Sequence, residues 1–349
     1  MQYATIPHLL SLQKISMPAL HTTLARFCAC VVFVLQTTQL CAQESTPRTK
    51  DIQIKAYDTS FYALIDKDTK AFVLYNKGIW PEGAVMLPDK SLIFSDVKAN
   101  KLLRYDEKQG VSVYLPISHF QNGHTLDTKG NLIAASHGKR GIEKFENGKW
   151  VMLADSYKGK NLIAPMTALH IAMVIFILPI QPLGSAMHKK AMVAKSSKMA
   201  NMSIATHLQA IPLCVLIRHS LKPPNGLALS PDEKTLYVAD SQKAYNTDDP
   251  TLHAHIIAYT LDKDNNLSQE RIFATFKEGF PDGIKVDSKG NVWSSGKNGI
   301  LVFSPDGTLL GEIIVGNVVG NLAFGVNEAN KPVLYITANT ELLRIDLPE

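Results

Sequence analysis

Four side chains that could bind a hard metal ion each stand directly before a glycine. They are Glu82, Asn122, Asn225 and Asp282, in the tripeptides PEG, QNG, PNG and PDG. Two offer carboxylate oxygens and two offer amide oxygens. Calcium and magnesium prefer such oxygen ligands, whereas zinc sites are rich in thiolate and imidazole. If these side chains meet, they predict a site for one divalent cation.

Each of these residues, taken singly, has a simpler explanation, because Asn-Gly and Asp-Gly are common turn formers. Their shared context favours the metal site. Each glycine is followed by a short alternating stretch, a tight turn and a second apolar stretch, in AVMLPDKSLIFSD, HTLDTKGNLIAAS, LALSPDEKTLYVAD and IKVDSKGNVWSSG. Pro, Asp and Gly stand where a chain reversal needs them.

The repeats predict the fold. Copies begin near residues 81, 121, 224 and 281, and a looser copy begins at Gly320-Asn321. A repeated small antiparallel sheet is typical of a β-propeller, whose innermost strands line a central channel. A residue at the same place in each repeat would therefore face one point on the axis. We expect an all-β protein with the four oxygen-bearing side chains around that point.

One copy of the repeat is missing. The interval from residue 121 to residue 224 is about twice the others, so the absent copy should fall near residue 165. Counting it gives a six-bladed β-propeller with one blade disrupted in this chain. Residues 161–219 are also foreign in composition, with one Gly, no Asp or Glu, and six of the ten Met residues.

Three interpretations of this segment are open. Hydropathy alone predicts that residues 166–183 form a membrane span or a buried helix. The third is translation out of frame. The Met166 codon ATG followed by the AC of Thr167 restores GAC, an Asp, and Met173 followed by Val174 restores GGT, a Gly. The remaining codons permit N-S-P-N-D-G, an alternating strand, an N-G turn and a second strand.

We favour the frame shift, because the restored sequence is the missing repeat in the expected place. The segment as it stands is then too apolar to pair as blade strands. An unclosed ring would leave strand edges exposed, which favours aggregation. We therefore expect impaired activity in this chain.

The amino terminus resembles a secretory signal over residues 1–42. Arg26 precedes the apolar run FCACVVFVLQTTQL, and Leu40-Cys41-Ala42 offers a cleavage site. The start could be Met1 or Met17, and an uncleaved anchor is the alternative. Cleavage would give a periplasmic or secreted protein without a membrane span. Three of the four cysteines lie in this leader and Cys214 lies in the aberrant segment, so no disulfide pair is expected.

Net charge argues against nucleic-acid binding. The formal charge is +5. Seven basic residues of the leader and of the aberrant segment account for more than this excess: Lys14, Arg26, Lys189, Lys190, Lys195, Lys198 and Arg218. The rest of the chain is slightly acidic. We expect residues 43–74 to form a lead-in and outer strands, and residues 75–349 to form the propeller. The oligomeric state is not fixed by the sequence.

The motifs PEG, NG, restored NSPND, PNGLALSPD, PDGIKVD and NLAFG resemble, in order and spacing, the gluconolactonase/regucalcin (senescence-marker protein) family of lactone hydrolases. The resemblance covers roughly residues 75–349 and implies a six-bladed propeller. It implies that Glu82, Asn225 and Asp282 bind the divalent metal, helped by the Asn of NSPND. It also implies that Asn122 contacts substrate and that Asp282 accepts a proton.

The resemblance implies metal-dependent hydrolysis of a sugar lactone, a small-molecule substrate. Calcium is the expected ion, with magnesium, manganese or zinc as alternatives. The ion would polarise the lactone carbonyl while water attacks, with Asp282 or a hydroxide on the ion as base. The sequence has no G-x-S-x-G motif, which agrees with a mechanism without a serine nucleophile.

Two other functions are alternatives. One is a non-catalytic ligand-binding propeller, since this architecture hosts many recognition modules. The other is a related lactonase or phosphotriesterase with another substrate.

Several histidines and one arginine give weaker signals. His137 and Arg140, in AASHGKRG, are candidate substrate-binding residues for an anionic substrate, and a surface turn is the simpler interpretation. His124 could face the channel or pack inside its strand. His253 and His255 should lie on one face of a strand, where an ordinary outer strand is the preferred interpretation.

Overall fold

The structure is a computed structural model, and it describes residues 48–157, 160–161, 165–171, 174–179, 204–206, 224–262 and 267–349. The predicted leader, Cys214 and most of the aberrant segment lie outside these residues. The described chain is all-β, with seven antiparallel sheets and two short 3-10 helices, η1 (Thr59–Ala63) and η2 (Gln242–Ala244). None of the helices in this part of the chain is long and apolar enough to cross a membrane.

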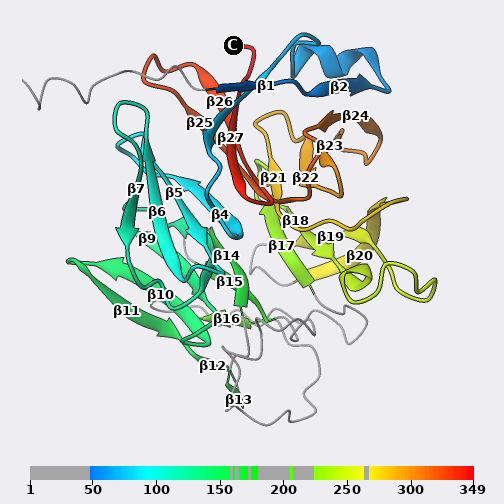
Figure 1. The fold of residues 1–349 in the computed structure, drawn as a ribbon. Helices are drawn as coiled ribbons and strands as arrows, with labels where there is room; N and C mark the ends of the chain where they lie inside the picture. The colour runs from blue at the N-terminus through cyan, green and yellow to red at the C-terminus, as the bar shows by residue number, and fades with distance from the viewer. Residues whose placement is uncertain are drawn as a thin grey trace, which may run out of the picture. The chain divides into compact units, whose positions relative to one another are not determined.

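Five of the sheets are propeller blades, each built around consecutive strands of the chain (Figure 1). The first blade contains β4 (Pro81–Met86), β5 (Leu92–Asp96), β6 (Lys101–Asp106) and β7 (Gly110–Leu115). The second contains β8 (Gln121–Leu126), β9 (Leu132–Ser136), β10 (Gly141–Glu146) and β11 (Lys149–Ala154). The next complete blade contains β17 (Pro224–Leu229), β18 (Thr235–Asp240), β19 (His255–Leu261) and β20 (Leu267–Thr275).

Strands from the two ends of the chain share the last two blades. One blade contains β21 (Ile284–Val286), β22 (Val292–Ser295), β23 (Gly299–Phe303), β24 (Leu309–Ile314) and the early strand β2 (Gln53–Ala56). The other contains β25 (Val319–Val326), β26 (Pro332–Ala338), β27 (Glu341–Asp346), β3 (Ala71–Tyr75) and β1 (Arg48–Lys50). Figure 1 shows these early strands in blue beside the late strands in orange and red.

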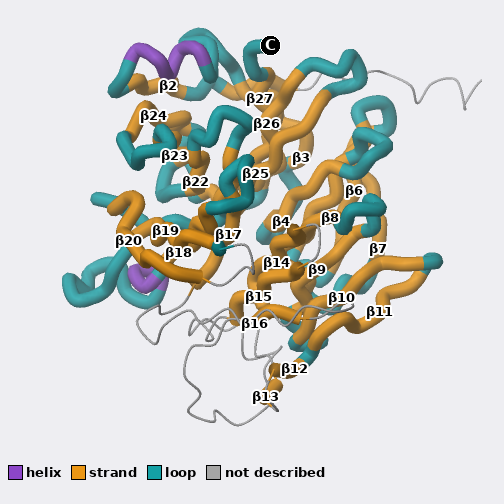
Figure 2. The backbone as a smooth tube through the Cα atoms, turned by 180° about the vertical axis from the view of Figure 1, so that it is seen from behind, coloured by secondary structure: helices purple, strands orange, loops and turns teal. Residues whose placement is uncertain are grey.

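A three-stranded sheet stands where the missing repeat was expected. It contains β14 (Pro165–Ile171), β15 (Val174–Pro179) and β16 (Ile204–Thr206). Strand β14 lies beside β8 and also beside β17, so it falls between two complete blades (Figure 2). The described residues therefore give five complete blades, not the six that the repeats predict. A two-stranded sheet, β12 (Ser156–Tyr157) with β13 (Lys160–Asn161), completes the set.

The expectation that the apolar segment cannot pair as strands is wrong for its described part. Leu169 stands opposite Phe176, and Ile177 stands opposite Ile204 in the neighbouring strand. The predicted helix is likewise absent from residues 165–171 and 174–179. The physical reason is that ladder hydrogen bonds use backbone groups, while valine, isoleucine and phenylalanine favour extended backbone.

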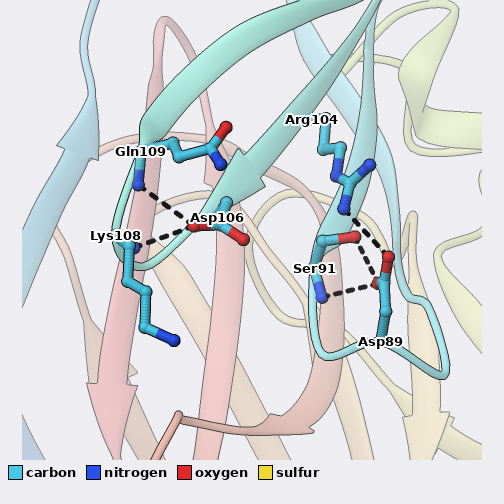
Figure 3. Close-up of polar contacts among 6 residues, drawn as sticks. All are labelled: Asp89, Ser91, Arg104, Asp106, Lys108 and Gln109. Atoms are coloured by element: carbon cyan, nitrogen blue, oxygen red, sulfur yellow. Dashed lines mark hydrogen bonds and ion pairs between the residues drawn. The ribbon is translucent and has the colours of Figure 1, made fainter.

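The tight turns have the chemistry that the repeat predicts. In the first blade, the Asp89 carboxylate accepts hydrogen bonds from the Ser91 backbone N–H at 3.0 Å and from Arg104 at 2.9 Å (Figure 3). Asp106 accepts from the backbone N–H groups of Lys108 and Gln109 at 2.9 and 3.0 Å. These carboxylates satisfy backbone donors that the reversal leaves without strand partners.

The core lies between blades and consists mainly of the strand side chains that point toward the neighbouring blade. Trp293, Tyr335, Phe61, Phe94 and Leu92 are its largest side chains with almost no exposure. Helix η1 contributes Phe61, which packs among residues of the last two blades. The early segment thus adds both strands and core to the end of the ring, and this packing holds the inner strands in place.

Candidate metal and substrate site

The four predicted oxygen-bearing residues lie at equivalent positions of four inner strands. Glu82 and Asn122 are the second residues of β4 and β8, Asn225 is the second residue of β17, and Asp282 stands two residues before β21. Strand β4 lies beside β8 and β25, and β21 lies beside β17 and β25. The repeat therefore places these side chains at the same end of neighbouring strands, as expected.

Glu82 and Asp282 are close enough for their charges to interact. Burial raises the pKa of Asp282 well above its usual range, and repulsion from Glu82 raises it further. A hydrogen bond from the Asn225 amide partly offsets this rise. Glu82 is 2% exposed and Asn225 is 7% exposed. The structure thus brings together the three predicted metal ligands, two carboxylates of like charge and one amide.

The Glu82 carboxylate is held by three donors. The Trp80 indole N–H lies 3.2 Å from Oε1, the Gly83 backbone N–H lies 3.3 Å from Oε2, and the Asn321 side chain donates a further bond. Burial still raises the pKa of Glu82 to about 7, because desolvation outweighs these donors. The hydrogen bonds therefore fix the direction of the carboxylate, and a nearby positive charge would further stabilise its ionised form.

Gly320 makes room for Glu82. A Cβ atom at residue 320 would collide with Oε1 of Glu82, so this position accepts only glycine without displacement of the carboxylate. Gly320 takes the place in its strand that Glu82 and Asp282 take in theirs, since the Gly283 N–H donates to the Gly320 carbonyl at 2.9 Å. At this position the looser repeat has a glycine that leaves room for the Glu82 carboxylate, where the other repeats have an oxygen-bearing side chain.

Asp282 is held through its backbone. Its carbonyl accepts from the Gly226 N–H at 2.9 Å, and its own N–H donates to Ser295 Oγ at 3.0 Å. A Cβ at Gly226 would collide with the same carbonyl oxygen. The glycine of the repeat therefore permits two inner strands to approach closely, and this approach sets the position of Asp282 relative to Asn225.

A lysine to which the repeat pattern gives no role lies near the Glu82 carboxylate. Lys285 lies on β21, and its ammonium donates to Asn321 Oδ1 at 3.4 Å and to the Ile284 carbonyl at 3.3 Å. Burial lowers the pKa of Lys285 to about 8, while attraction to Glu82 acts in the opposite direction. Lys285 is therefore mainly protonated at neutral pH and adds one positive charge to the site.

Asn122 and His124 lie on the next inner strand. Asn122 is 5% exposed, and its carbonyl accepts from Ser95 Oγ at 3.3 Å. His124 is 6% exposed, and its Nδ1 lies 2.8 Å from the Gly83 carbonyl. A carbonyl only accepts, so Nδ1 carries the proton. Burial lowers the pKa of His124 to about 4. Of the two open interpretations, the structure supports a packed, neutral histidine that joins β8 to β4.

The weaker candidates lie in a turn of the second blade. His137 and Arg140 bound the turn between β9 and β10, at the same end of the blade as Asn122 because Gln121 stands opposite Ser136. The Arg140 side chain is exposed. The substrate role of both residues stays a prediction.

His253 and His255 are adjacent to each other, and β19 begins at His255, so His253 lies just before the strand that was predicted to hold both. The rings of His253 and His255 stack at 5.1 Å, and His255 Nδ1 lies 3.1 Å from Thr275 Oγ1. They share one side of the chain, as the alternation predicted. Within the described ranges, no group of three or more His, Cys, Asp or Glu side chains could hold a metal ion.

The donor set of the site nevertheless fits one hard divalent cation. Two partly or fully buried carboxylates repel each other, and an amide completes the set. A cation with two positive charges would remove the repulsion and favour ionised carboxylates. Lys285 places one positive charge near Glu82, and one charge cannot neutralise two carboxylates. The residues present therefore suit calcium or magnesium.

Three contributors to the site were missed at the level of sequence. The repeat pattern gives no role to Trp80, Lys285 or Asn321. Trp80 stands two residues before Glu82, and Lys285 stands three residues after Asp282. Strand alternation puts alternate residues on one face, and this rule could have found Trp80. The hydrogen bond from Asn321 to Glu82 depends on which inner strands are neighbours, and the repeat pattern does not predict that.

A family model described as "SMP-30/Gluconolactonase/LRE-like region" matches residues 80–165 and 186–340 of the chain. These two ranges cover more than half of the sequence. A gluconolactonase of Zymomonas mobilis is 28% identical over 84% of this chain and 85% of its own length.

Solved structures show the same similarity. A gluconolactonase of Xanthomonas campestris has a TM-score of 0.73 and 26% identity, covering 87% of this chain and 99% of that one. Regucalcin of Agrobacterium tumefaciens, a calcium-binding protein, has a TM-score of 0.56 and 14% identity, covering 79% of this chain and 93% of that one. At that identity the second likeness shows the fold alone.

Proposed function

Because this chain belongs to the SMP-30/gluconolactonase/LRE-like family, we propose that it hydrolyses a sugar lactone with the help of one divalent cation. Gluconolactonases among its relatives support lactone hydrolysis at the level of the family. The substrate of this chain would be an aldonolactone such as glucono-1,5-lactone. The observation that carries the proposal is the pair of carboxylates, Glu82 and Asp282, that interact in one site beside the Asn225 amide.

Glu82, Asn225 and Asp282 would hold the ion, for which calcium is the first choice and magnesium, manganese and zinc are alternatives. The ion supplies Lewis acidity that polarises the lactone carbonyl. Trp80 and Asn321 keep the Glu82 carboxylate in its direction by donating hydrogen bonds. Fixed donors of this kind avoid reorganisation during the reaction, which is a main source of electrostatic catalysis.

Asp282 would act as the general base. Its carboxylate would take a proton from the water that attacks the lactone carbonyl, and would give this proton to the ring oxygen as the ring C–O bond breaks, which yields a hydroxy acid. The Asn225 amide and the Ser295 hydroxyl hold the Asp282 side chain and backbone. Asn122, at the equivalent position of β8, would contact the hydroxyl groups of the sugar.

The test is hydrolysis of glucono-1,5-lactone by the purified full chain. We expect acid release above the spontaneous rate, its loss with a chelator and its return with calcium. Asp282→Asn should lower kcat by about 10²–10⁴-fold, the range for removal of a general base. The control is Asp51→Asn, since Asp51 is exposed and paired with Lys70 far from the inner strands in the fold.

The outcomes separate the candidate functions. Turnover that survives both the chelator and Asp282→Asn would overturn the proposed site. Ion binding without turnover of any lactone would point to the non-catalytic binding propeller. Preference for phosphotriesters or aromatic lactones over aldonolactones would leave the mechanism and change the substrate.

Impaired activity and export remain part of the proposal. The frame shift would remove the Asn of N-S-P-N-D and so one side chain of the inner ring. Export is tested by sequencing the amino terminus of the protein from the periplasm or medium, where we expect Gln43 as the first residue.

A further inference from the structure

Lys285 carries a positive charge into a site that is built to receive a divalent cation. Its ammonium donates to Asn321 Oδ1 at 3.4 Å and to the Ile284 carbonyl at 3.3 Å, which are long hydrogen bonds. Among the described residues, no carboxylate lies within ion-pair distance of Lys285. The charge is therefore not neutralised by a direct partner, although it acts on Glu82 through space.

Asn321 fixes the relation between Lys285 and Glu82. Its side-chain oxygen accepts from the Leu322 N–H at 2.8 Å and from Lys285, while its amide donates to Glu82. Its backbone N–H donates to Thr337 Oγ1 at 3.0 Å. One amide thus separates the ammonium from the carboxylate, so the two charges stay near each other without contact.

The charges of the site then have a definite sum. Glu82 and Asp282 contribute two negative charges when both are ionised, and a divalent cation with Lys285 contributes three positive charges. The loaded site has a net charge of +1. Coulomb repulsion between Lys285 and the cation weakens ion binding, and the net charge favours an anion beside the ion.

We propose that Lys285 is a second cation of the metal site, which lowers the affinity for the divalent ion and binds the oxygen anion formed when a lactone is opened. The inference rests on the proposed function and names a further binding residue in the same site. The anion is first the charged carbonyl oxygen and then the carboxylate of the hydroxy-acid product. Lys285 thus weakens binding of the metal ion and stabilises the negative charge of this anion.

The experiment measures calcium binding to the full chain by calorimetry, for the wild type, Lys285→Met, Lys285→Arg and the control Lys289→Met. Lys289 is exposed in the turn of the same blade, so its replacement removes the same charge outside the site. We expect at least about tenfold tighter calcium binding by Lys285→Met, from the lost repulsion. Lys285→Arg and Lys289→Met should stay within about threefold of the wild type.

A second measurement follows the anion. Gluconate, the acid formed from glucono-1,5-lactone, is titrated into the calcium-loaded proteins. We expect about tenfold weaker gluconate binding by Lys285→Met and unchanged binding by Lys289→Met. Thermal unfolding checks that each variant is folded, and Lys285→Gln, which keeps a donor for Asn321, replaces Lys285→Met if the latter does not fold.

The failures are distinguishable. If the wild type binds no divalent ion, the proposed metal site is wrong and the role of Lys285 falls with it. If the wild type binds calcium and the folded Lys285 variants bind it no more tightly, only the role of Lys285 is overturned. Tighter calcium binding with unchanged gluconate binding would overturn the anion part of the inference.

Discussion

Glu82 and Asp282 show how a single residue position acquires chemistry from its neighbours. Each is an ordinary turn-like residue in sequence, before a glycine. In the structure, burial raises the pKa of both carboxyl groups, and repulsion from Glu82 raises the pKa of Asp282 further. Whether a carboxylate at this position is a ligand or a turn residue thus depends on the strands beside it, and the shared register of the repeats was the signal for this arrangement.

Gly320 gives a prediction at the scale of one atom. Gly320→Ala would place a methyl group against the Glu82 carboxylate and force it from its three donors. We expect at least about tenfold weaker calcium binding, from loss of a ligand's direction. Calorimetry of the folded variant measures this. The control is Ala323→Gly in the same strand, which should change the stability of the fold but not calcium binding. Gly316→Ala is not used as a control, because Gly316 has a φ of 77°, which strains alanine.

The elevated pKa of Glu82 predicts how stability depends on pH in the absence of metal. The folded chain holds this proton up to about pH 7, whereas an unfolded glutamate loses it near its ordinary pKa of 4.5. The folded state therefore binds more protons across that window, and the free energy of unfolding should fall as the pH rises from about 4.5 to about 7. The fall from Glu82 is about 3 kcal/mol.

Urea unfolding of the chelated protein at pH 5, 6, 7 and 8 checks this prediction. Glu82→Gln has no titrating group at residue 82 and should show a smaller decline. Calcium should remove most of the decline in the wild type. Equal pH profiles for the wild type and Glu82→Gln would show that Glu82 does not titrate in this window.

At the scale of elements, the segment before β4 positions a donor for the site. The Asp96 carboxylate, at the end of β5, accepts from the backbone N–H groups of Ile79 and Trp80 at 2.8 and 2.9 Å. It accepts a third bond from the Ala99 N–H at 3.3 Å. Asp96 thus holds the lead-in to β4, and through Trp80 it directs Glu82.

Asp96→Ala should therefore lower both stability and metal affinity. Asp96 is 2% exposed, and its loss leaves three partly buried backbone donors without their acceptor. We expect the free energy of unfolding to fall by about 3 kcal/mol. Urea unfolding and calcium titration measure the two effects. Asp106→Ala in the same blade removes a carboxylate from an exposed turn and should change calcium binding by less than about twofold (Figure 3).

At the scale of the whole molecule, the sequence predicted the propeller but not its completeness. The turn residues and the glycines before each strand pair located the inner strands of five blades correctly. We expected six blades, and the described residues form five complete ones. The described part of the aberrant segment forms strands where we expected none. The error arose because apolar composition does not prevent backbone pairing.

The contacts between blades could not be predicted for a related reason. A repeat identifies equivalent positions within each blade, but which side chains meet depends on the neighbouring strand and its exact displacement. Asn321 reaches Glu82 because Gly320 leaves space, and Lys285 reaches Asn321 because β21 lies beside β25. Neither contact is encoded in a pattern of one strand.

The frame-shift hypothesis gives a prediction for the whole chain. A variant that carries the restored reading between Lys160 and Leu221 should unfold at a higher temperature and hydrolyse glucono-1,5-lactone faster, by about tenfold or more if the lost Asn belongs to the inner ring. Calorimetric unfolding and acid release compare the two chains. Lower stability of the restored chain would favour a genuine insertion at residues 161–219.

The early strands also constrain how the protein is made. Strand β3 pairs with β27, so Val73 stands opposite Leu343, and β2 pairs with β24. Strands β2 and β3 are synthesised first, so they cannot pair until β24 and β27, near the end of the chain, have been synthesised. Such distant pairing makes folding slow. A nascent chain of this kind cannot close its ring of blades until synthesis is nearly complete.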